Sequence, residues 1–179
     1  MSMRLAIPRE TYPGENRASA TPETVKKLVR LGAEVVIEAG AGAGAGILDD
    51  DYVEQGATIE PDRDALLGSA DMVLRLRKPE ADEISKLKPG CVHVSYLDPF
   101  NEHGLIKQFA EHNITAISME MIPRSTRSQK MDALSSQANL AGYVAVMLAA
   151  ARLPRILPMM MTPAGTLKPA KGFVIGAGV

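Results

Sequence analysis

The fold is decided by one stretch of sequence, residues 91–117, which reads CVHVSYLDPFNEHGLIKQFAEHNITAI. Residues 91–96 form an apolar, β-branched run that predicts a strand, and residues 114–117 predict a second strand. Between them, residues 101–112 predict a helix whose apolar side chains share one face. A strand, a helix and a second strand in direct succession are typical of a parallel sheet with right-handed crossovers.

The same alternation extends toward the N-terminus. Further strands are predicted at residues 4–8, 34–38 and 71–76. A helix is predicted to begin after Thr21, which suits the N-cap, with Pro22 in the first helical position. We therefore expect an α/β fold: an open, mostly parallel sheet with helices on both faces, as in Rossmann-like and flavodoxin-like lobes.

Composition excludes several classes of protein. Hydrophobic residues make up 46% of the 179 residues, charged residues 23%, and the formal net charge is −1. A nucleic-acid-binding module would carry a basic excess, so we expect no nucleic acid as a partner. The single cysteine, Cys91, excludes a disulfide framework and a cysteine-based zinc site. Because His93, His103 and His112 share no metal-ligand spacing, we expect no metal.

The chain changes character after residue 133. Residues 133–151 carry no charged side chain, but the first turns are polar, so we expect a long buried helix and no insertion into a membrane. Prolines at 154, 158, 163 and 169 exclude a helix and favour a linker or small hairpin. The chain is thus divided into an α/β lobe (1–133), a connecting helix (134–153), a linker or hairpin (154–170) and the first strand of a truncated NAD-binding Rossmann lobe (171–179).

Two glycine runs follow predicted strands, as glycines do in dinucleotide-binding turns. Residues 40–46 offer one candidate, but three aspartates follow at 49–51 without a sustained helical pattern, which favours a flexible loop. Gly176, Gly178 and Val179 follow an apolar, strand-like run and are candidate cofactor-binding residues. Only half of the glycine pattern is present at that end, so we expect the chain to be a fragment that is inactive alone.

A polar loop follows the predicted strand at 114–117. Ligands of open α/β sheets bind beyond the carboxyl ends of the strands, which makes this loop a candidate site. Arg124 is expected to pair with Asp132, which leaves Gln129 free to donate and accept hydrogen bonds with a carboxamide such as nicotinamide. The alternative is a solvated loop in which Asp132 or Ser135 caps the long helix.

Two clusters of basic side chains lie near predicted strand ends. The first contains Arg9 and Arg17, and the second contains Arg75, Arg77 and Lys78. A guanidinium binds a carboxylate or a phosphate through two parallel hydrogen bonds, so either cluster could hold an anion. The alternative is a set of structural ion pairs. The acidic candidates for such pairs are Glu10, Glu15 and Glu80.

Several motifs together resemble the superfamily of alanine dehydrogenases and nicotinamide nucleotide transhydrogenases. They are PRE at 8–10, ENRA at 15–18, TP at 21–22, EAGAG at 38–42 and ADMVL at 70–74. More specific are IPR at 122–124 and QKMDALSSQANLAGY at 129–143, which resemble the Arg-Gln-Asp loop of the transhydrogenase alpha subunit, in its NAD(H)-binding component. MTPAGT at 161–166 and PAK at 169–171 continue the match, so the resemblance covers essentially the whole chain.

The resemblance implies hydride transfer between NAD(H) and NADP(H), coupled to proton movement across a membrane. It implies that Arg124, Gln129 and Asp132 act at the catalytic site and, with Ser135, contact bound NAD(H) near the nicotinamide. It also implies an NADP(H)-binding component and a membrane subunit as partners, a homodimer, and a place on the cytoplasmic or matrix side, peripheral to the membrane through those partners.

Two other functions are weighed against this one. In an alanine dehydrogenase, the substrate-binding Arg and Lys would fall at Arg17 and Arg77, and the catalytic His would fall at Asp98. A carboxylate cannot serve as the same proton-transfer group, and the change from Lys to Arg is a second departure, so the transhydrogenase interpretation is favoured. A truncated oligomerisation or docking module is the other alternative, and an exposed apolar face at residues 159–161 would favour it.

Overall fold

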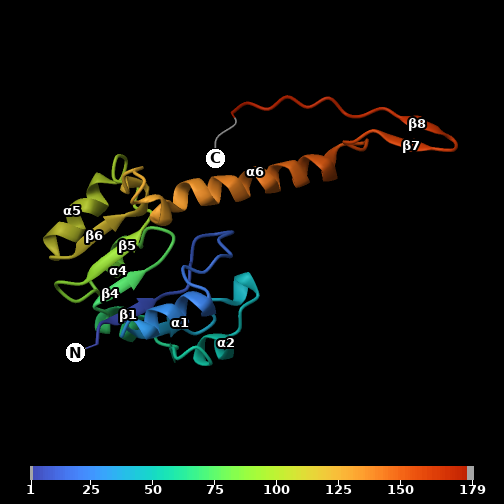
Figure 1. Cartoon of the computed structure of the whole chain (residues 1–179). Coiled ribbons are helices and arrows are strands. Elements are labelled where there is room, and N and C mark those ends of the chain that lie inside the picture. Colours follow the sequence, from blue (N-terminus) through green and yellow to red (C-terminus); the bar gives the residue numbers. More distant parts are fainter. Residues whose placement is uncertain (1, 177–179) are drawn as a thin grey trace. The chain divides into compact units, whose positions relative to one another are not determined.

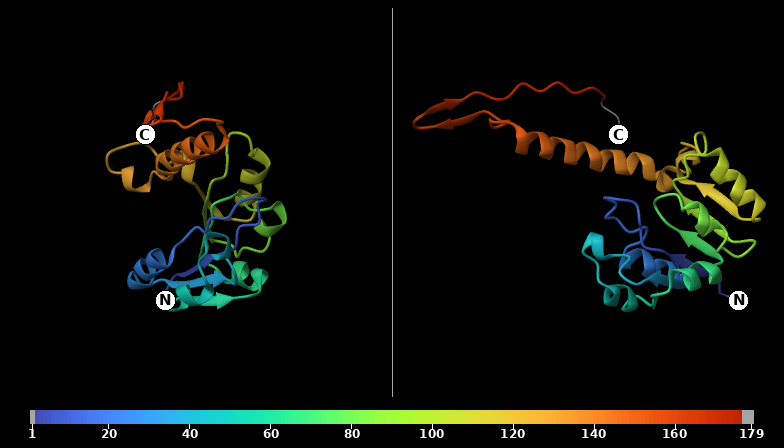
Figure 2. Two further views of the ribbon diagram at one scale, coloured as in Figure 1. Left: turned by 90° about the vertical axis from the view of Figure 1, so that its right-hand side faces the viewer. Right: turned by 180° about the vertical axis from the view of Figure 1, so that it is seen from behind.

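The computed structural model describes residues 2–176 and divides the chain into two compact units, residues 1–121 and residues 122–179 (Figures 1 and 2). Unit 1 contains a parallel sheet with its covering helices. Unit 2 contains a polar loop, a long helix and a hairpin.

Unit 1 is built on a six-stranded sheet with the order β3-β2-β1-β4-β5-β6, in which every neighbouring pair is parallel. The strands are β1 (Arg4–Ile7), β2 (Glu34–Glu38), β3 (Thr58–Glu60), β4 (Met72–Leu74), β5 (Val92–Ser95) and β6 (Thr115–Ser118). The strand order reverses beside β1, so the crevice between the carboxyl ends of β1 and β4 is the topological switch point. The prediction of an open, parallel, Rossmann-like sheet is confirmed.

Helices cover both faces of this sheet (Figure 1). They are α1 (Pro22–Arg30), α2 (Asp49–Val53), α3 (Arg63–Ser69), α4 (Ala81–Ile84) and α5 (His103–Glu111). The predicted N-cap of α1 is confirmed, because the Thr21 hydroxyl accepts a hydrogen bond from the Thr24 N–H at 3.3 Å and Pro22 opens the helix.

Two apolar clusters form the core, one on each face of the sheet. Val25 of α1 and Tyr52 of α2 pack with Leu5, Ile7 and other side chains of β1 and β2 on one face. Leu66 of α3, Ile84 of α4 and Phe109 of α5 pack with the oppositely directed side chains on the other face. Successive strand residues point to opposite faces, and a parallel sheet is buried on both, so its strands are continuously apolar.

The glycine run after β2 forms a packed turn, so the prediction of a flexible loop there is wrong. A Cβ on Gly42 would lie 2.8 Å from both Ile47 and Tyr52, and a Cβ on Gly44 would lie 2.8 Å from the Asn16 carbonyl oxygen. These glycines therefore permit close packing of chain segments. Helix α2 begins directly after the turn, and its Asp49 carboxylate accepts hydrogen bonds from the Gly40 N–H at 2.9 and 3.1 Å.

Unit 2 contains a long helix, α6 (Ala133–Arg152), none of whose residues is buried. The prediction of a buried helix is therefore wrong, because the loop and the hairpin of unit 2 leave its apolar side chains uncovered. By length and composition alone, α6 is the one helix among the described residues that could cross a membrane, with a mean hydropathy of 1.2.

A short antiparallel hairpin follows α6. Strand β7 (Met160–Thr162) pairs with β8 (Gly165–Leu167) around a turn that contains Pro163. Residues 168–176 form no strand, which corrects the prediction of a strand there, because no described segment pairs with them and the side chain of Phe173 is 90% exposed. Gly178 and Val179 lie outside the described residues.

Candidate functional site

Glutamates hold the main chain at neighbouring strand ends along the carboxyl edge of the sheet. The Glu38 carboxylate, at the end of β2, accepts a hydrogen bond from the Arg9 N–H after β1 at 2.8 Å. The Glu10 carboxylate accepts hydrogen bonds from the N–H groups of Leu76 and Arg77 after β4, at 2.5 and 3.2 Å. The loops after β1, β2 and β4 are therefore tied together at the switch point.

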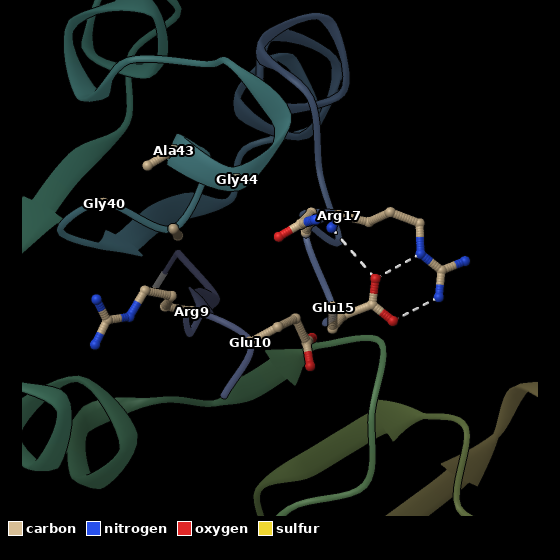
Figure 3. A pocket seen from close by; sticks show the side chains of 9 residues that line it. Arg9, Glu10, Glu15, Arg17, Gly40, Ala43 and Gly44 are labelled. Atoms are coloured by element: carbon tan, nitrogen blue, oxygen red, sulfur yellow. Dashed lines mark hydrogen bonds and ion pairs between the residues drawn. The ribbon is translucent and has the colours of Figure 1, made fainter. Parts of the chain in front are cut away.

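A pocket of about 240 Å³ opens between the loops after β1 and β2 (Figure 3). Its lining residues are Arg9, Glu10, Glu15, Asn16, Arg17, Gly40, Ala41, Ala43 and Gly44. Arg17 donates from Nε and from one Nη to the two carboxylate oxygens of Glu15, both at 2.7 Å (Figure 3). This bidentate pair occupies the side of the guanidinium that would otherwise receive an external carboxylate.

Arg77 joins the same cluster from the loop after β4. Its Nε donates to Glu15 at 2.9 Å, and its guanidinium lies over the Tyr12 ring, 4.7 Å from the centroid. The hydrogen bond from the Arg17 side chain, reinforced by Arg77 and opposed by burial, lowers the pKa of Glu15 to about 2. The alternative of structural ion pairs is confirmed for Arg17 and Arg77, since both pair with Glu15. Glu80 forms no ion pair within residues 2–176.

A chain of buried ion pairs lies beneath these loops. Arg63 of α3 binds Glu38 at 2.5 Å and Glu83 of α4 at 2.6 Å, and Arg75 binds the second Glu83 oxygen at 2.7 Å. Arg63 also donates to the main-chain carbonyl of Arg9 at 3.0 Å. Although burial raises the pKa of Glu83, the charges and hydrogen bonds of Arg75 and Arg63 outweigh it, so the pKa is lowered.

Sequence reasoning missed Arg63 and Glu83. They belong to short helices, 20 residues apart, and no motif joins them. The only available signal was the basic cluster at Arg75, whose partner we expected among other acidic residues. The structure supplies Glu83 instead.

Asp98 stands in an unusual backbone conformation after β5. Its φ is +52°, in the left-handed region that non-glycine residues seldom adopt, and Pro99 follows it. Its N–H donates to the Glu120 carboxylate at 2.5 Å, and its own carboxylate accepts from Asn101 Nδ2 at 2.8 and 3.1 Å. Asp98 therefore shapes the loop between β5 and α5, and this position holds no imidazole for proton transfer.

In unit 2, Asp132 is the N-cap of α6. Its two carboxylate oxygens accept hydrogen bonds from the Ser135 N–H at 2.9 Å and from the Ser135 hydroxyl at 2.7 Å. These main-chain and side-chain bonds, with a smaller contribution from the Arg124 charge, lower the pKa of Asp132. Within residues 2–176, Arg124 forms no ion pair with Asp132, so that expectation is wrong. The carboxylate caps the helix instead, which was the alternative.

The remaining loop residues present their side chains to solvent. Gln129 opens a single 3-10 turn (Gln129–Met131), and Arg124 lies in the irregular segment before it. Both are exposed, and no hydrogen bond joins either side chain to another described residue. The hydroxyls of Ser125 and Ser128 lie 3.0 Å apart and brace the loop between them.

The expected site residues thus fall into separate groups. Asp132 and Ser135 are in direct contact, while Arg124 and Gln129 lie in the same loop without touching them. Gly176 lies at φ +90°, a conformation that favours glycine, at the end of the described chain. Among residues 2–176, no three His, Cys, Asp or Glu side chains are grouped so that they could hold a metal ion.

A doubly wound parallel sheet, with polar loops at its carboxyl edge and a switch point between β1 and β4, defines unit 1 as a Rossmann-like α/β lobe. The family model "Alanine dehydrogenase/PNT, N-terminal domain" matches residues 6–141, and the chain belongs to this family.

Individual relatives agree with this assignment. The chain is 45% identical over 182 residues to the first polypeptide of the NAD(P) transhydrogenase alpha subunit of Rhodospirillum rubrum, a match that covers 99% of this chain and 47% of the relative. The crystal structure of a transhydrogenase from Sinorhizobium meliloti superposes with a TM-score of 0.89 at 46% identity, over 93% of this chain and 50% of that one. An alanine dehydrogenase of Halomonas elongata is 31% identical over 180 residues, 99% of this chain and 48% of its own length. The chain therefore spans about half the length of the relatives it matches.

Proposed function

We propose that this chain forms the N-terminal portion of the NAD(H)-binding component of a proton-translocating NAD(P) transhydrogenase, which transfers hydride between NAD(H) and NADP(H). The similarity to transhydrogenase alpha subunits exceeds that to alanine dehydrogenases, 45% against 31% identity over comparable lengths. Because the chain covers about half of these relatives, we expect it to be inactive alone and active with the polypeptides that complete it.

One structural observation carries the proposal. The loop that resembles the transhydrogenase Arg-Gln-Asp loop is fixed at its C-terminal end by the Asp132 cap, while Gln129 and Arg124 keep their side chains exposed. A loop anchored to a 20-residue helix, with free polar side chains three and eight residues before the cap, presents those side chains to a ligand or partner.

The chemistry of the loop fits a nicotinamide. Gln129 has an amide oxygen that accepts and an amide nitrogen that donates, which matches the carboxamide of the ring. NAD(H), when bound, supplies the hydride, and direct transfer needs two rings held in position with water excluded rather than an acid or a base. We therefore assign binding and orientation to Gln129 and Arg124, and the holding of the loop to Asp132 and Ser135.

The rest of the dinucleotide requires more than the described residues. Gly176, with Gly178 and Val179, would form the first half of a phosphate-binding turn, and the positive φ of Gly176 supports a turn at that point. We expect the chain alone to bind NADH poorly. Titration of the chain with NADH, followed by fluorescence, tests this, and micromolar affinity would show that a second lobe is not required.

The partners follow from the same proposal. An NADP(H)-binding component supplies the second nicotinamide, and a membrane subunit holds the complex at the cytoplasmic or matrix side of the membrane. We assign α6 to contacts with protein rather than lipid, because its first turns carry Ser135, Ser136 and Gln137.

A second candidate, an oligomerisation or docking module, is favoured by one observation. Met159, Met160 and Met161 of the hairpin region are 59%, 46% and 74% exposed, which leaves an apolar surface beside the uncovered α6. This role is compatible with the first one, since a homodimer would cover such surface. Light scattering after size exclusion distinguishes a monomer from a dimer directly.

Reconstitution tests the proposed activity. The chain is combined with the polypeptides that complete a transhydrogenase, and reduction of an NADP analogue by NADH is followed spectroscopically. We expect hydride transfer only in the complete assembly. Oxidation of alanine by NAD in the same assembly, without transfer between nucleotides, would favour the alanine dehydrogenase alternative instead.

A further inference from the structure

Three buried polar side chains lie side by side on β4 and β5, beneath the carboxyl edge of the sheet. Arg75 is 5% exposed, His93 is 1% exposed and Ser95 is fully buried. Nε of Arg75, both ring nitrogens of His93 and Oγ of Ser95 have no hydrogen-bond partner among the described protein atoms. These atoms form a polar step inside an otherwise apolar cluster.

The strand register places these side chains together. Val73 of β4 is opposite His93 of β5, and the Arg75 N–H continues the ladder by donating to the Val94 carbonyl at 3.1 Å. Arg75 therefore follows Val73 on the same face, as Ser95 follows His93, because side chains alternate along a strand. Neighbouring strands are about 4.8 Å apart, so polar atoms on adjacent side chains lie within reach of one bridging molecule.

The surroundings leave no protein group to satisfy these atoms. The His93 ring packs against Phe109, with ring centroids 5.0 Å apart, and Ile84 and Leu97 belong to the same cluster. Buried polar groups in folded proteins are almost always hydrogen-bonded, to protein or to ordered water. Four unpartnered atoms on three adjacent side chains therefore indicate a shared, non-protein partner.

The charge balance indicates that this partner is neutral. Two guanidinium groups, Arg63 and Arg75, are matched by two carboxylates, Glu38 and Glu83, in one continuous chain of ion pairs. Burial, reinforced by the nearby Arg75 charge, lowers the pKa of His93 to about 3, so the imidazole is neutral. An added ion would stand uncompensated in the core.

The hydrogen-bonding capacity narrows the choice further. Arg75 Nε–H only donates, so the partner must accept, which excludes a metal cation or an ammonium group. A neutral imidazole has one donor and one acceptor nitrogen, and the Ser95 hydroxyl both donates and accepts. A water molecule accepts twice and donates twice, and buried waters make about three hydrogen bonds each.

We propose that ordered internal water occupies this site, accepting from Arg75 Nε and hydrogen-bonding to Ser95 Oγ and a ring nitrogen of His93. The water would join the end of β4, from which Leu76 and Arg77 continue into the pocket loop, to the end of β5. This proposal concerns the fold of unit 1 and does not depend on the proposed transhydrogenase activity.

The sign of a stability change tests the proposal in the chain itself. If Ser95 Oγ is bonded to water, S95A removes a hydrogen bond, and the equilibrium constant for unfolding in urea rises about two- to tenfold. If the hydroxyl is unpartnered, the same substitution removes a buried, unsatisfied group, and that constant falls or stays the same. S19A is the matched control, because the Ser19 hydroxyl donates directly to the Leu74 carbonyl at 2.9 Å and its loss sets the scale.

A second variant and a direct observation complete the test. H93F keeps a ring against Phe109, and with S95A it should raise the unfolding constant by less than the product of the single effects, because both remove the same water. Stabilisation by H93F would overturn the proposal. In a high-resolution crystal structure we expect density within hydrogen-bond distance of Arg75 Nε and Ser95 Oγ. Absence of density, or a halide revealed by bromide anomalous scattering, would also overturn it.

Discussion

The carboxylate of Asp132 binds both the main-chain N–H and the side-chain hydroxyl of Ser135, at 2.9 and 2.7 Å. This relationship fixes the point at which the polar loop of unit 2 becomes helix α6. It also explains why Gln129 and Arg124 remain exposed, since the carboxylate expected to pair with Arg124 is already engaged by Ser135.

The Asp132 cap gives the first prediction. D132A removes the acceptor for both Ser135 donors, so we expect the first turn of α6 to fray. Amide hydrogen exchange at residues 133–136 should become faster, while exchange in the middle of α6 changes little. Q129A is the matched control, because its side chain makes no hydrogen bond to another described residue. Unchanged exchange in D132A would show that the cap contributes nothing.

The Glu15 carboxylate gives a prediction about pH. Its pKa is lowered to about 2 in the folded chain, chiefly by the hydrogen bond from Arg17, against an ordinary value of 4.5. A depressed folded-state pKa stabilises the fold above the unfolded value, and this contribution is lost as the pH falls from about 4.5 toward 2. The slope of unfolding free energy against pH in this window should be smaller in E15Q. An identical slope in both proteins would contradict the assignment.

The buried ion-pair chain gives the third prediction. R63M leaves Glu38 and Glu83 without their shared partner, and breaking a buried pair in this way costs about 3–5 kcal/mol. R63K should recover only part of the loss, because one ammonium group cannot reproduce the planar fork that binds both carboxylates and the Arg9 carbonyl. Urea unfolding at pH 7 measures both variants. A loss below about 1 kcal/mol in R63M would mean that the chain of pairs behaves as a surface network.

The turn after β2 gives the fourth prediction. G44A places a Cβ 2.8 Å from the rigid Asn16 main chain, so we expect a loss of about 1–3 kcal/mol from overpacking. G104A is the matched control, because a Cβ there meets nothing within 4 Å and alanine favours the helix α5. The control should be neutral or stabilising by up to about 1 kcal/mol. Equal effects of the two substitutions would contradict the packing explanation for the glycine run.

The sequence allowed the prediction of the sheet because its strands are apolar on both faces and separated by punctuated helices. Helices α2, α3 and α4 escaped prediction because they span only five, seven and four residues, too short for a periodic apolar stripe. The packed glycine turn depends on Tyr52 and Asn16, and that tertiary contact has no local signature.

The candidate site was predictable in its residues more than in its contacts. Asp132 and Ser135 were both expected at the start of α6, and capping was one of two alternatives, because a carboxylate three residues before a serine suits either role. The choice between them depends on the loop conformation. The uncovered surface of α6 escaped prediction because an apolar, small-residue helix has the same sequence whether its partner lies in the same unit or elsewhere.

The most direct test of the central claim compares Q129A with K130A in the reconstituted transhydrogenase. The two side chains are adjacent and exposed, but only Gln129 is assigned to orient the nicotinamide. Misplacing reacting groups by about 1 Å lowers rates roughly 100-fold. We expect Q129A to slow hydride transfer from NADH by at least about tenfold, with NADH affinity nearly unchanged and K130A close to the parent enzyme. Equal rates in Q129A and the parent enzyme would contradict the claim that this loop positions the nicotinamide.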